Sequence, residues 1–169
     1  LLNTLGTKVN ITPLANADTL TQFKLGNIDG AWVPEPWASR LVLEGKGKVL
    51  VNEADLWPNG EFATTLIATT TDFKNKYPAA VEAVLKANTD ALYLINNVPD
   101  KAKELSQKEI AKQTGKKLSA EVLNRAWENL TFGADPLQQT LKKSAEDAVR
   151  VGQLKLGTVN LDEIYDLGK

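Results

Sequence analysis

An alternation of short apolar runs with helical patterns in the first third restricts the fold of this chain more than any other feature. Three apolar runs are the predicted strands: 9–14, 28–33 and 48–51. The run 28–33 is almost continuously apolar, which is typical of a strand covered on both faces. Helical patterns at 18–24 and from Pro36 to about Gly45 separate the three runs. This rhythm favours an open parallel sheet, so we predict the α/β fold class.

The remainder of the chain is predicted to be largely helical. Residues 63–70 are rich in β-forming side chains and predict a further strand. Beyond them, apolar residues recur with the helical period and proline, serine and glycine mark the ends. The predicted helices are 78–97, Pro99 to a stop at Gly115, a helix capped by Ser119, 136–151 and a short piece at 161–167. We also interpret Leu1–Leu5 as the last turn of a helix that Gly6 closes.

The residue types that the chain lacks narrow its chemistry. It contains no histidine and no cysteine. Disulfides and thiolate sites are therefore excluded, and the commonest general base and metal ligand is missing. A site built from carboxylates alone stays open. We nevertheless predict that the protein is not an enzyme, with no catalytic residue, no metal and no cofactor.

The charges argue against a polyanionic partner. The 20 basic and 21 acidic residues are interspersed and give a net charge of −1, so no strong field attracts nucleic acid or an anionic membrane. The lysine-rich stretch 101–117 has no interleaved aromatic residue and is typical of a solvated helix face. No apolar run approaches the roughly 20 residues that span a bilayer.

Two prolines, an acid and two tryptophans follow the second predicted strand, in "AWVPEPW" (31–37). Pro34 and Pro36 each fix φ, so the strand leads stiffly into the next helix. Ligands of open α/β sheets bind outside the carboxyl ends of strands. We therefore predict that Trp32, Glu35, Pro36 and Trp37 line a ligand site. The alternative is that the two indoles are core residues and Glu35 stabilises the helix N-terminus.

Two further segments are candidates for the same site. In "PLANADT" (13–19), Asn16 and Ala17 open a helix whose N–H groups can receive an anion, unless Asn16 or Asp18 is simply the N-cap. In "ADLWPNGEFATT" (54–65), Glu61 and Thr64 offer polar groups beside a Pro-Asn-Gly turn. The alternative for that turn is an ordinary surface loop.

Three long segments, taken in order, resemble one known family. They are "LTQFKLGNIDGAWVPEPWASRL", "LIATTTDFKNKYPAAVEAVLKA" and "TGKKLSAEVLNRAWENLTFGADPLQQTLKKSAEDAVRVGQL". Together they are similar to solute-binding proteins of ABC importers in the nitrate/sulfonate/bicarbonate (taurine-type) family, most of all its aliphatic-sulfonate branch.

The resemblance implies a periplasmic-binding-protein type II fold, with two α/β lobes, crossover strands and a ligand cleft between the lobes. On this basis we expect 1–57 to form most of the second lobe, 58–70 the crossover strand or hinge, and 71–169 the C-terminal helical part that returns to the first lobe. Because the chain contains no methionine, we expect it to be a fragment whose upstream part, with any targeting signal, precedes Leu1.

The implied function is extracytoplasmic. The protein would bind a small anion, such as an aliphatic sulfonate, taurine or nitrate, and deliver it to an ABC permease. It would act as a monomer, either in the periplasm or lipid-anchored on the outer face of the cytoplasmic membrane. An acid at position 35 repels an anion unless it is protonated or paired. Glu35 could instead orient Trp37 or a helix terminus, or face the cationic part of a zwitterionic ligand.

Two other functions stay open on the same architecture. One is an enzyme similar to thiamine-pyrimidine synthases, whose chemistry draws on the histidine and cysteine that are absent here. The other is the ligand-sensing domain of a transcription regulator. A signal peptide upstream of Leu1 indicates transport, whereas a helix-turn-helix indicates regulation.

Overall fold

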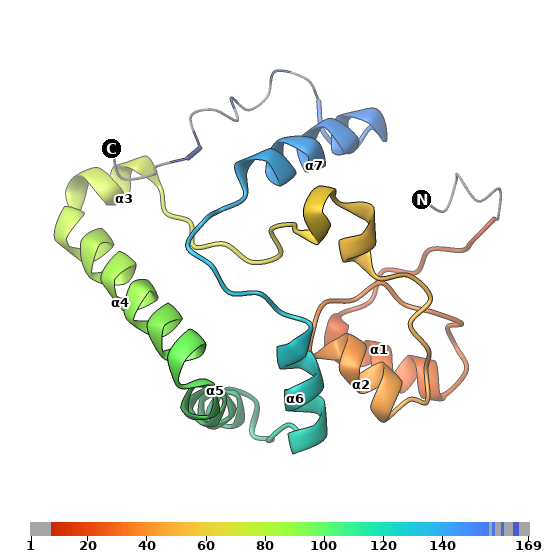
Figure 1. Cartoon of the computed structure of the whole chain (residues 1–169). Coiled ribbons are helices and arrows are strands. Elements are labelled where there is room, and N and C mark those ends of the chain that lie inside the picture. Colours follow the sequence, from red (N-terminus) through yellow and green to blue (C-terminus); the bar gives the residue numbers. More distant parts are fainter. Residues whose placement is uncertain (1–7, 156, 158–159, 161–163, 166–169) are drawn as a thin grey trace. The chain divides into compact units, whose positions relative to one another are not determined.

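The computed structural model describes residues 8–155, 157, 160, 164 and 165, and this part is helical (Figure 1). The α-helices are α1 (Asn16–Lys24), α2 (Trp37–Leu43), α3 (Thr71–Lys76), α4 (Pro78–Asn97), α5 (Pro99–Thr114), α6 (Ala120–Glu128) and α7 (Gln138–Arg150). Two short 3-10 helices, η2 (Glu53–Leu56) and η3 (Pro58–Gly60), lie between α2 and α3. In the described residues, no helix is both long and apolar enough to cross a membrane.

The predicted strands are absent from the described residues. The segments 9–14, 28–33, 48–51 and 63–70 contain no strand, so the α/β class is not confirmed. A strand needs a neighbour, because its backbone N–H and C=O groups pair across strands and not within one. Within the described part, no backbone hydrogen bond pairs two of these segments. Apolar patterning predicted which segments suit a strand, but it carries no information about their partners.

The helix predictions are confirmed with small shifts. The bounds of α4 agree with the prediction, and α5 begins at Pro99 and ends before Gly115, whose φ of 72° requires the left-handed conformation that glycine adopts freely. Ser119 caps α6 as predicted, since its Oγ accepts a hydrogen bond from the Val122 N–H at 3.2 Å. Helix α7 begins two residues later than predicted.

Helix α3 was not predicted. Thr70, at the end of a β-rich run, is its N-cap, and its Oγ1 accepts a hydrogen bond from the Phe73 N–H at 3.1 Å. The predicted turn of Leu1–Leu5 lies outside the described residues, and most of the predicted piece at 161–167 does so too.

The chain divides into two compact units. Unit 1 comprises Leu1–Val49 and Leu118–Leu130, and unit 2 comprises Leu50–Lys117 and Thr131–Lys169. In unit 1, α2 packs against α1 and α6. The buried side chains at these contacts are Thr19, Leu20, Ser39, Leu41, Val122 and Ala126. Helix α6 therefore completes the core of unit 1 from a distant part of the sequence.

Unit 2 is held together by consecutive helices. Helix α4 packs against α3 and α5, and Ala102 of α5 is buried. Helix α7 is tied to the segment between η3 and α3 by a hydrogen bond from the Ala63 N–H to Thr140 Oγ1, at 3.3 Å. The predicted lobe limits of 1–57, 58–70 and 71–169 stay predictions.

Candidate functional site

The segment that carries the prolines closes the amino-terminal end of α2. The N–H groups of Trp37 and Ala38 both donate to the Pro34 carbonyl, at 3.0 and 3.2 Å. The Ser39 N–H donates to Glu35 Oε2 at 3.1 Å, and the Arg40 N–H donates to the Pro36 carbonyl at 3.0 Å. The first four N–H groups of a helix have no partner inside the helix, and here all four have one. This helix end therefore has no spare N–H group for a ligand.

Pro36 stands one residue before the helix and not in its first turn, where we predicted it. It is the N-cap of α2, and the Glu35–Pro36 peptide bond is cis. The ψ of Pro36 is 7°, outside the helical range, so the helix begins at Trp37.

Both carboxylate oxygens of Glu35 are engaged within unit 1. Oε2 accepts from the Ser39 N–H at 3.1 Å, and Oε1 accepts from Asn129 Nδ2 at 2.7 Å. Asn129 is the residue that follows the last turn of α6. A carboxylate at a helix N-terminus is favourable, because it faces the positive end of the helix dipole. These contacts support the alternative in which Glu35 stabilises the N-terminus of α2. The place of Glu35 in a ligand site stays a prediction.

Sequence reasoning missed Asn129. The hydrogen bond to Glu35 spans 94 residues, and no local pattern marks an asparagine after a helix as the partner of a distant acid. Knowledge that α6 packs on α2 was needed to find it.

The two indoles differ in their surroundings. The Trp32 side chain is 57% exposed, so it is not a core residue. Trp37 is half-buried, and the Arg40 guanidinium carbon lies 5.2 Å from its ring centroid. Arg40 also pairs with both carboxylate oxygens of Glu44, each at 3.1 Å. Trp32 is therefore the more accessible aromatic surface of the two.

Asn16 and Ala17 are the first two residues of α1, and both are exposed. The N-cap is Ala15 and it makes no side-chain cap, so the alternative in which Asn16 or Asp18 is the N-cap is wrong. Among the described residues, no acceptor is found for the backbone N–H groups of Asn16 and Ala17. Unlike α2, this helix end keeps donors that can replace the water around an anion.

Glu61 and Thr64 belong to unit 2 and are both exposed. Glu61 lines an open hollow of about 410 Å³ together with residues 58–59 and 135–140 and Lys143. Thr64 is not among its lining residues. The hollow therefore contains one of the eight predicted site residues, and the structure does not bring Glu61 and Thr64 together there.

Lys143 is the cation of this hollow. Its Nζ lies 5.6 Å from the Trp57 ring centroid and 2.9 Å from Asp147 Oδ2. The hydrogen bond from Lys143 holds the pKa of Asp147 below its usual value. Arg150 also contacts Asp147, at 2.9 Å. The charge of Lys143 is thus already partly compensated by a carboxylate of its own helix.

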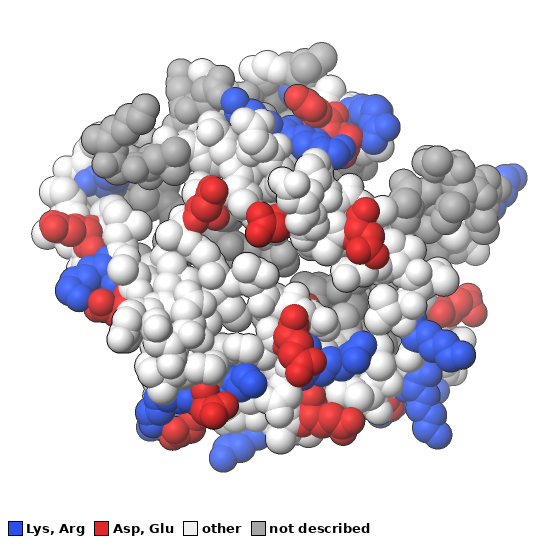
Figure 2. All heavy atoms as spheres, in the orientation of Figure 1, with Lys and Arg blue, Asp and Glu red and all other residues white. Residues whose placement is uncertain are grey.

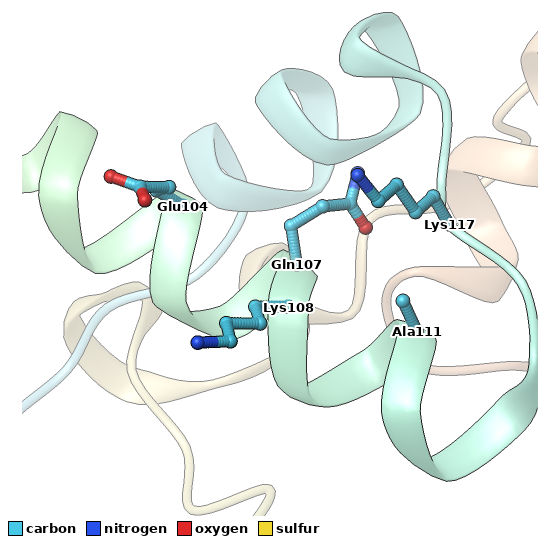
Figure 3. A pocket seen from close by; sticks show the side chains of 5 residues that line it. All are labelled: Glu104, Gln107, Lys108, Ala111 and Lys117. Carbon is cyan, nitrogen blue, oxygen red and sulfur yellow. The ribbon is translucent and has the colours of Figure 1, made fainter.

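A second hollow, of about 290 Å³, lies along α5 (Figure 3). The side chains of Gln107 and Lys117 point toward one another there, whereas the Glu104 carboxylate points away from them. Lys101 binds that carboxylate at 2.8 Å, and this hydrogen bond lowers the pKa of Glu104. No predicted site residue lines this hollow.

The charged side chains of the described residues are mixed in sign over the surface in view in Figure 2. Figure 2 shows acidic and basic side chains interspersed over the described part of the face in view. Within residues 8–155 and the few described beyond them, no group of three or more acidic, histidine or cysteine side chains could hold a metal ion.

Comparisons with known proteins identify the family. The sequence profile of the NMT1-like family matches residues 2–111. A relative is the nitrate import ATP-binding protein NrtC of Synechocystis sp. (strain ATCC 27184 / PCC 6803 / Kazusa), 34% identical over 83 residues, which are 49% of this chain and 12% of that protein. No solved structure matches the chain. Because the family match covers well over half of its residues, the chain belongs to the NMT1-like family.

Proposed function

We propose that the protein is the solute-binding component of an ABC importer and that it binds a small anion for delivery to a membrane permease. The observation that carries the proposal is the family match over residues 2–111, which includes every predicted site residue. The NMT1-like family includes nitrate/sulfonate/bicarbonate solute-binding proteins of ABC transporters. The name of the relative, a nitrate import protein, supports keeping nitrate beside taurine and other aliphatic sulfonates among the ligands to test.

Two features of unit 1 support an anion ligand. Asn16 and Ala17 offer backbone N–H groups at the positive end of the α1 dipole, where negative charge is stabilised. Trp32 offers an exposed indole, which can pack against the apolar part of a sulfonate. We propose that Glu35, Pro36 and Trp37 form a rigid segment that positions the Trp32 indole. Glu61 and Thr64 stay proposed site residues.

The finer parts of the proposal follow the family. We propose a periplasmic-binding-protein type II fold with an interlobe ligand cleft, and closure of the lobes on the anion as the signal for delivery. We place the protein in the periplasm or on the outer face of the cytoplasmic membrane, as is typical of the family. We further propose that it acts as a monomer, without a cofactor and without nucleic acid, and that its ligand preference is that of the aliphatic-sulfonate branch.

Isothermal titration calorimetry of the 169-residue chain tests the proposed function. Nitrate, taurine and ethanesulfonate are titrated separately, with methylammonium as a cationic control. We expect saturable one-to-one binding of at least one anion and none of methylammonium. A chain that is helical by circular dichroism and gives no saturable heat with any of the three anions would contradict the proposal.

The coding sequence on the 5′ side of the Leu1 codon separates this proposal from the two alternatives. A signal peptide there supports an exported binding protein. A helix-turn-helix in the same reading frame indicates the sensor domain of a transcription regulator and contradicts transport. An enzyme on the same architecture would require turnover of a substrate, and the chain has neither histidine nor cysteine to support it.

A further inference from the structure

An acid beside a proposed anion site needs an explanation. Glu35 lies three residues from Trp32 and two residues from Trp37. A carboxylate that faced a bound anion at about 4 Å would reduce its affinity about five-fold even at the dielectric constant of water. The surroundings of Glu35 show how unit 1 can keep this charge away from a ligand.

The carboxylate is held from two sides. Ser39 donates its backbone N–H to Oε2 from the first turn of α2, and Asn129 donates its side-chain amide to Oε1 from the end of α6. The backbone donor is a fixed part of α2, whereas the Asn129 amide is the only side-chain donor found for Glu35 among the described residues. Hydrogen bonds to an ionised acceptor are the stronger kind, so both bonds orient the carboxylate.

We infer that Asn129 is a positioning residue of the anion site, because its amide turns the Glu35 carboxylate onto the donors of unit 1 and away from the ligand. The inference rests on the proposed function, since it concerns the same site. It explains how a protein that binds anions tolerates an acid between Trp32 and Trp37. It also gives residues 118–130 a role in the site beyond completing the core of unit 1.

The charged neighbours are compatible with this role. On α2, Arg40 is already paired with Glu44 at 3.1 Å. On α6, Arg125 lies one helical turn before Asn129 and therefore on the same face of the helix. The donors found for Glu35 among the described residues are neutral, so the carboxylate is oriented by hydrogen bonds whose loss should be measurable.

A double-mutant cycle tests the inference. The dissociation constants for nitrate, taurine and ethanesulfonate are measured for the wild-type chain, Asn129→Ala, Glu35→Gln and the double variant. We expect Asn129→Ala to raise the dissociation constant of the bound anion about five-fold relative to the wild type. In the Glu35→Gln background, where no charge remains to be positioned, the same substitution should change it by less than about two-fold.

Two controls separate positioning from folding. Asn96→Ala changes an exposed asparagine of α4 in unit 2 and should leave the dissociation constant unaltered. Asn129→Leu keeps a side chain of similar size and removes the amide donor without adding a charge, so it should also weaken binding if the alanine variant does not fold. In the absence of ligand, the NMR resonance of the Ser39 amide should differ from that of the wild-type chain in both Glu35→Gln and Asn129→Ala.

The outcomes are distinct. A loss of affinity on Asn129→Ala that is equally large in both backgrounds shows a purely structural role and overturns the inference, as does the absence of any loss. A wild-type chain that binds none of the three anions overturns the proposed function, and the inference with it. A Ser39 amide that is insensitive to both substitutions contradicts the geometry itself.

Discussion

At the scale of single residues, short polar side chains at helix ends account for much of the local structure. Ser119 caps α6, Thr70 caps α3, and Asn52 Oδ1 accepts from the Ala54 N–H at 3.2 Å where η2 begins. Glu35 has the same function for α2, because it accepts from the Ser39 N–H. Helix ends leave N–H groups without partners, so each of these side chains satisfies a donor that the helix itself cannot.

Substitution of Ser39 by alanine is expected to stabilise the protein, whereas most substitutions destabilise the protein that carries them. The residue is fully buried at 0% exposure, and no partner for its Oγ is found in the described part of the chain. A buried hydroxyl without a partner is unfavourable, and alanine favours the helix. We expect Ser39→Ala to raise the free energy of unfolding by about 1 kcal/mol, measured by urea denaturation followed by circular dichroism.

Ser119→Ala in the same unit is the matched control. It removes the hydroxyl that accepts from the Val122 N–H, so it should lower the free energy of unfolding by about 1 kcal/mol. If Ser39→Ala destabilises the chain as much as Ser119→Ala does, the Ser39 hydroxyl has a partner in solution and its assignment here is wrong.

Asp147 gives a prediction about protonation. Its pKa is lowered chiefly by the hydrogen bond from Lys143, with Arg150 also nearby. A carboxyl whose folded pKa is depressed stabilises the fold above its unfolded pKa, and this stabilisation is lost as the pH falls through the folded value. We expect Lys143→Met to raise the pKa of Asp147 toward its usual value and to reduce the loss of stability in acid.

The measurement is an NMR titration of the Asp147 side chain, with Lys86→Met as the control. Lys86 pairs with Asp90 on α4 at 2.6 Å, whereas Asp147 pairs with Lys143 and Arg150 of α7. An Asp147 pKa that does not change on Lys143→Met would show that this hydrogen bond does not persist in solution.

At the scale of elements, the helices could be predicted and the strands could not. The ends of α4, α5 and α6 are marked by proline, glycine and serine, and each helix satisfies its backbone groups within its own segment. The runs 28–33 and 48–51 have strand composition, but a strand also depends on a partner elsewhere in the chain. Composition alone therefore could not establish a sheet, and none is present in the described residues.

Gly45 lies where the chain turns back at the end of α2. A Cβ there would lie 2.6 Å from the Leu41 carbonyl oxygen and 3.2 Å from Phe23 Cδ1. The carbonyl belongs to the backbone and cannot move without disturbing the helix. We expect Gly45→Ala to lower the free energy of unfolding by more than about 1 kcal/mol, measured by urea denaturation.

Gly30→Ala is the control for that substitution. No atom lies within 4 Å of a Cβ built at Gly30, so this change should alter the free energy of unfolding by less than about 0.5 kcal/mol. Equal effects of the two substitutions would contradict the close approach of Gly45 to α2.

The packing of α6 onto α2 gives a further prediction at this scale. Val122 is 1% exposed, and it is one of the two largest fully buried side chains of the described residues. Val122→Ala removes two methyl groups from this contact and should cost about 2 kcal/mol. Val49→Ala makes the same change at a side chain of unit 1 that is 58% exposed, and it should cost less than about 0.5 kcal/mol.

Urea denaturation of the two valine variants makes the comparison. A Val122→Ala chain as stable as the Val49→Ala chain would show that α6 does not complete the core of unit 1.

At the scale of the whole molecule, each of the two units is assembled from two separate segments of the sequence. Unit 1 combines residues 1–49 with 118–130, whereas unit 2 takes the segments on either side of α6. Val122, Ala126 and Asn129 therefore join a segment, 1–49, that ends at least 73 positions earlier in the chain. This non-local closure is the reason that the sequence did not predict the partner of Glu35.

The candidate site was predictable only in part, for the same reason. The segment 32–37 stood out because two prolines bracket an acid between two tryptophans. The order of several weak motifs indicated a nitrate/sulfonate/bicarbonate solute-binding protein, and the profile match shows the broader NMT1-like family. The spare N–H groups at α1, the exposure of Trp32 and the closed end of α2 could not be read from the sequence. They depend on how each helix begins in space.

The most direct test of an anion site on unit 1 is the calorimetric affinity of the Trp32→Ala chain for nitrate, taurine and ethanesulfonate. Tyr93→Ala, which removes a 68% exposed ring from α4, is the control. We expect Trp32→Ala to raise the dissociation constant of the bound anion about ten-fold, and Tyr93→Ala to leave it unaltered. A Trp32→Ala chain that binds the anion as tightly as the wild type would contradict the proposed site.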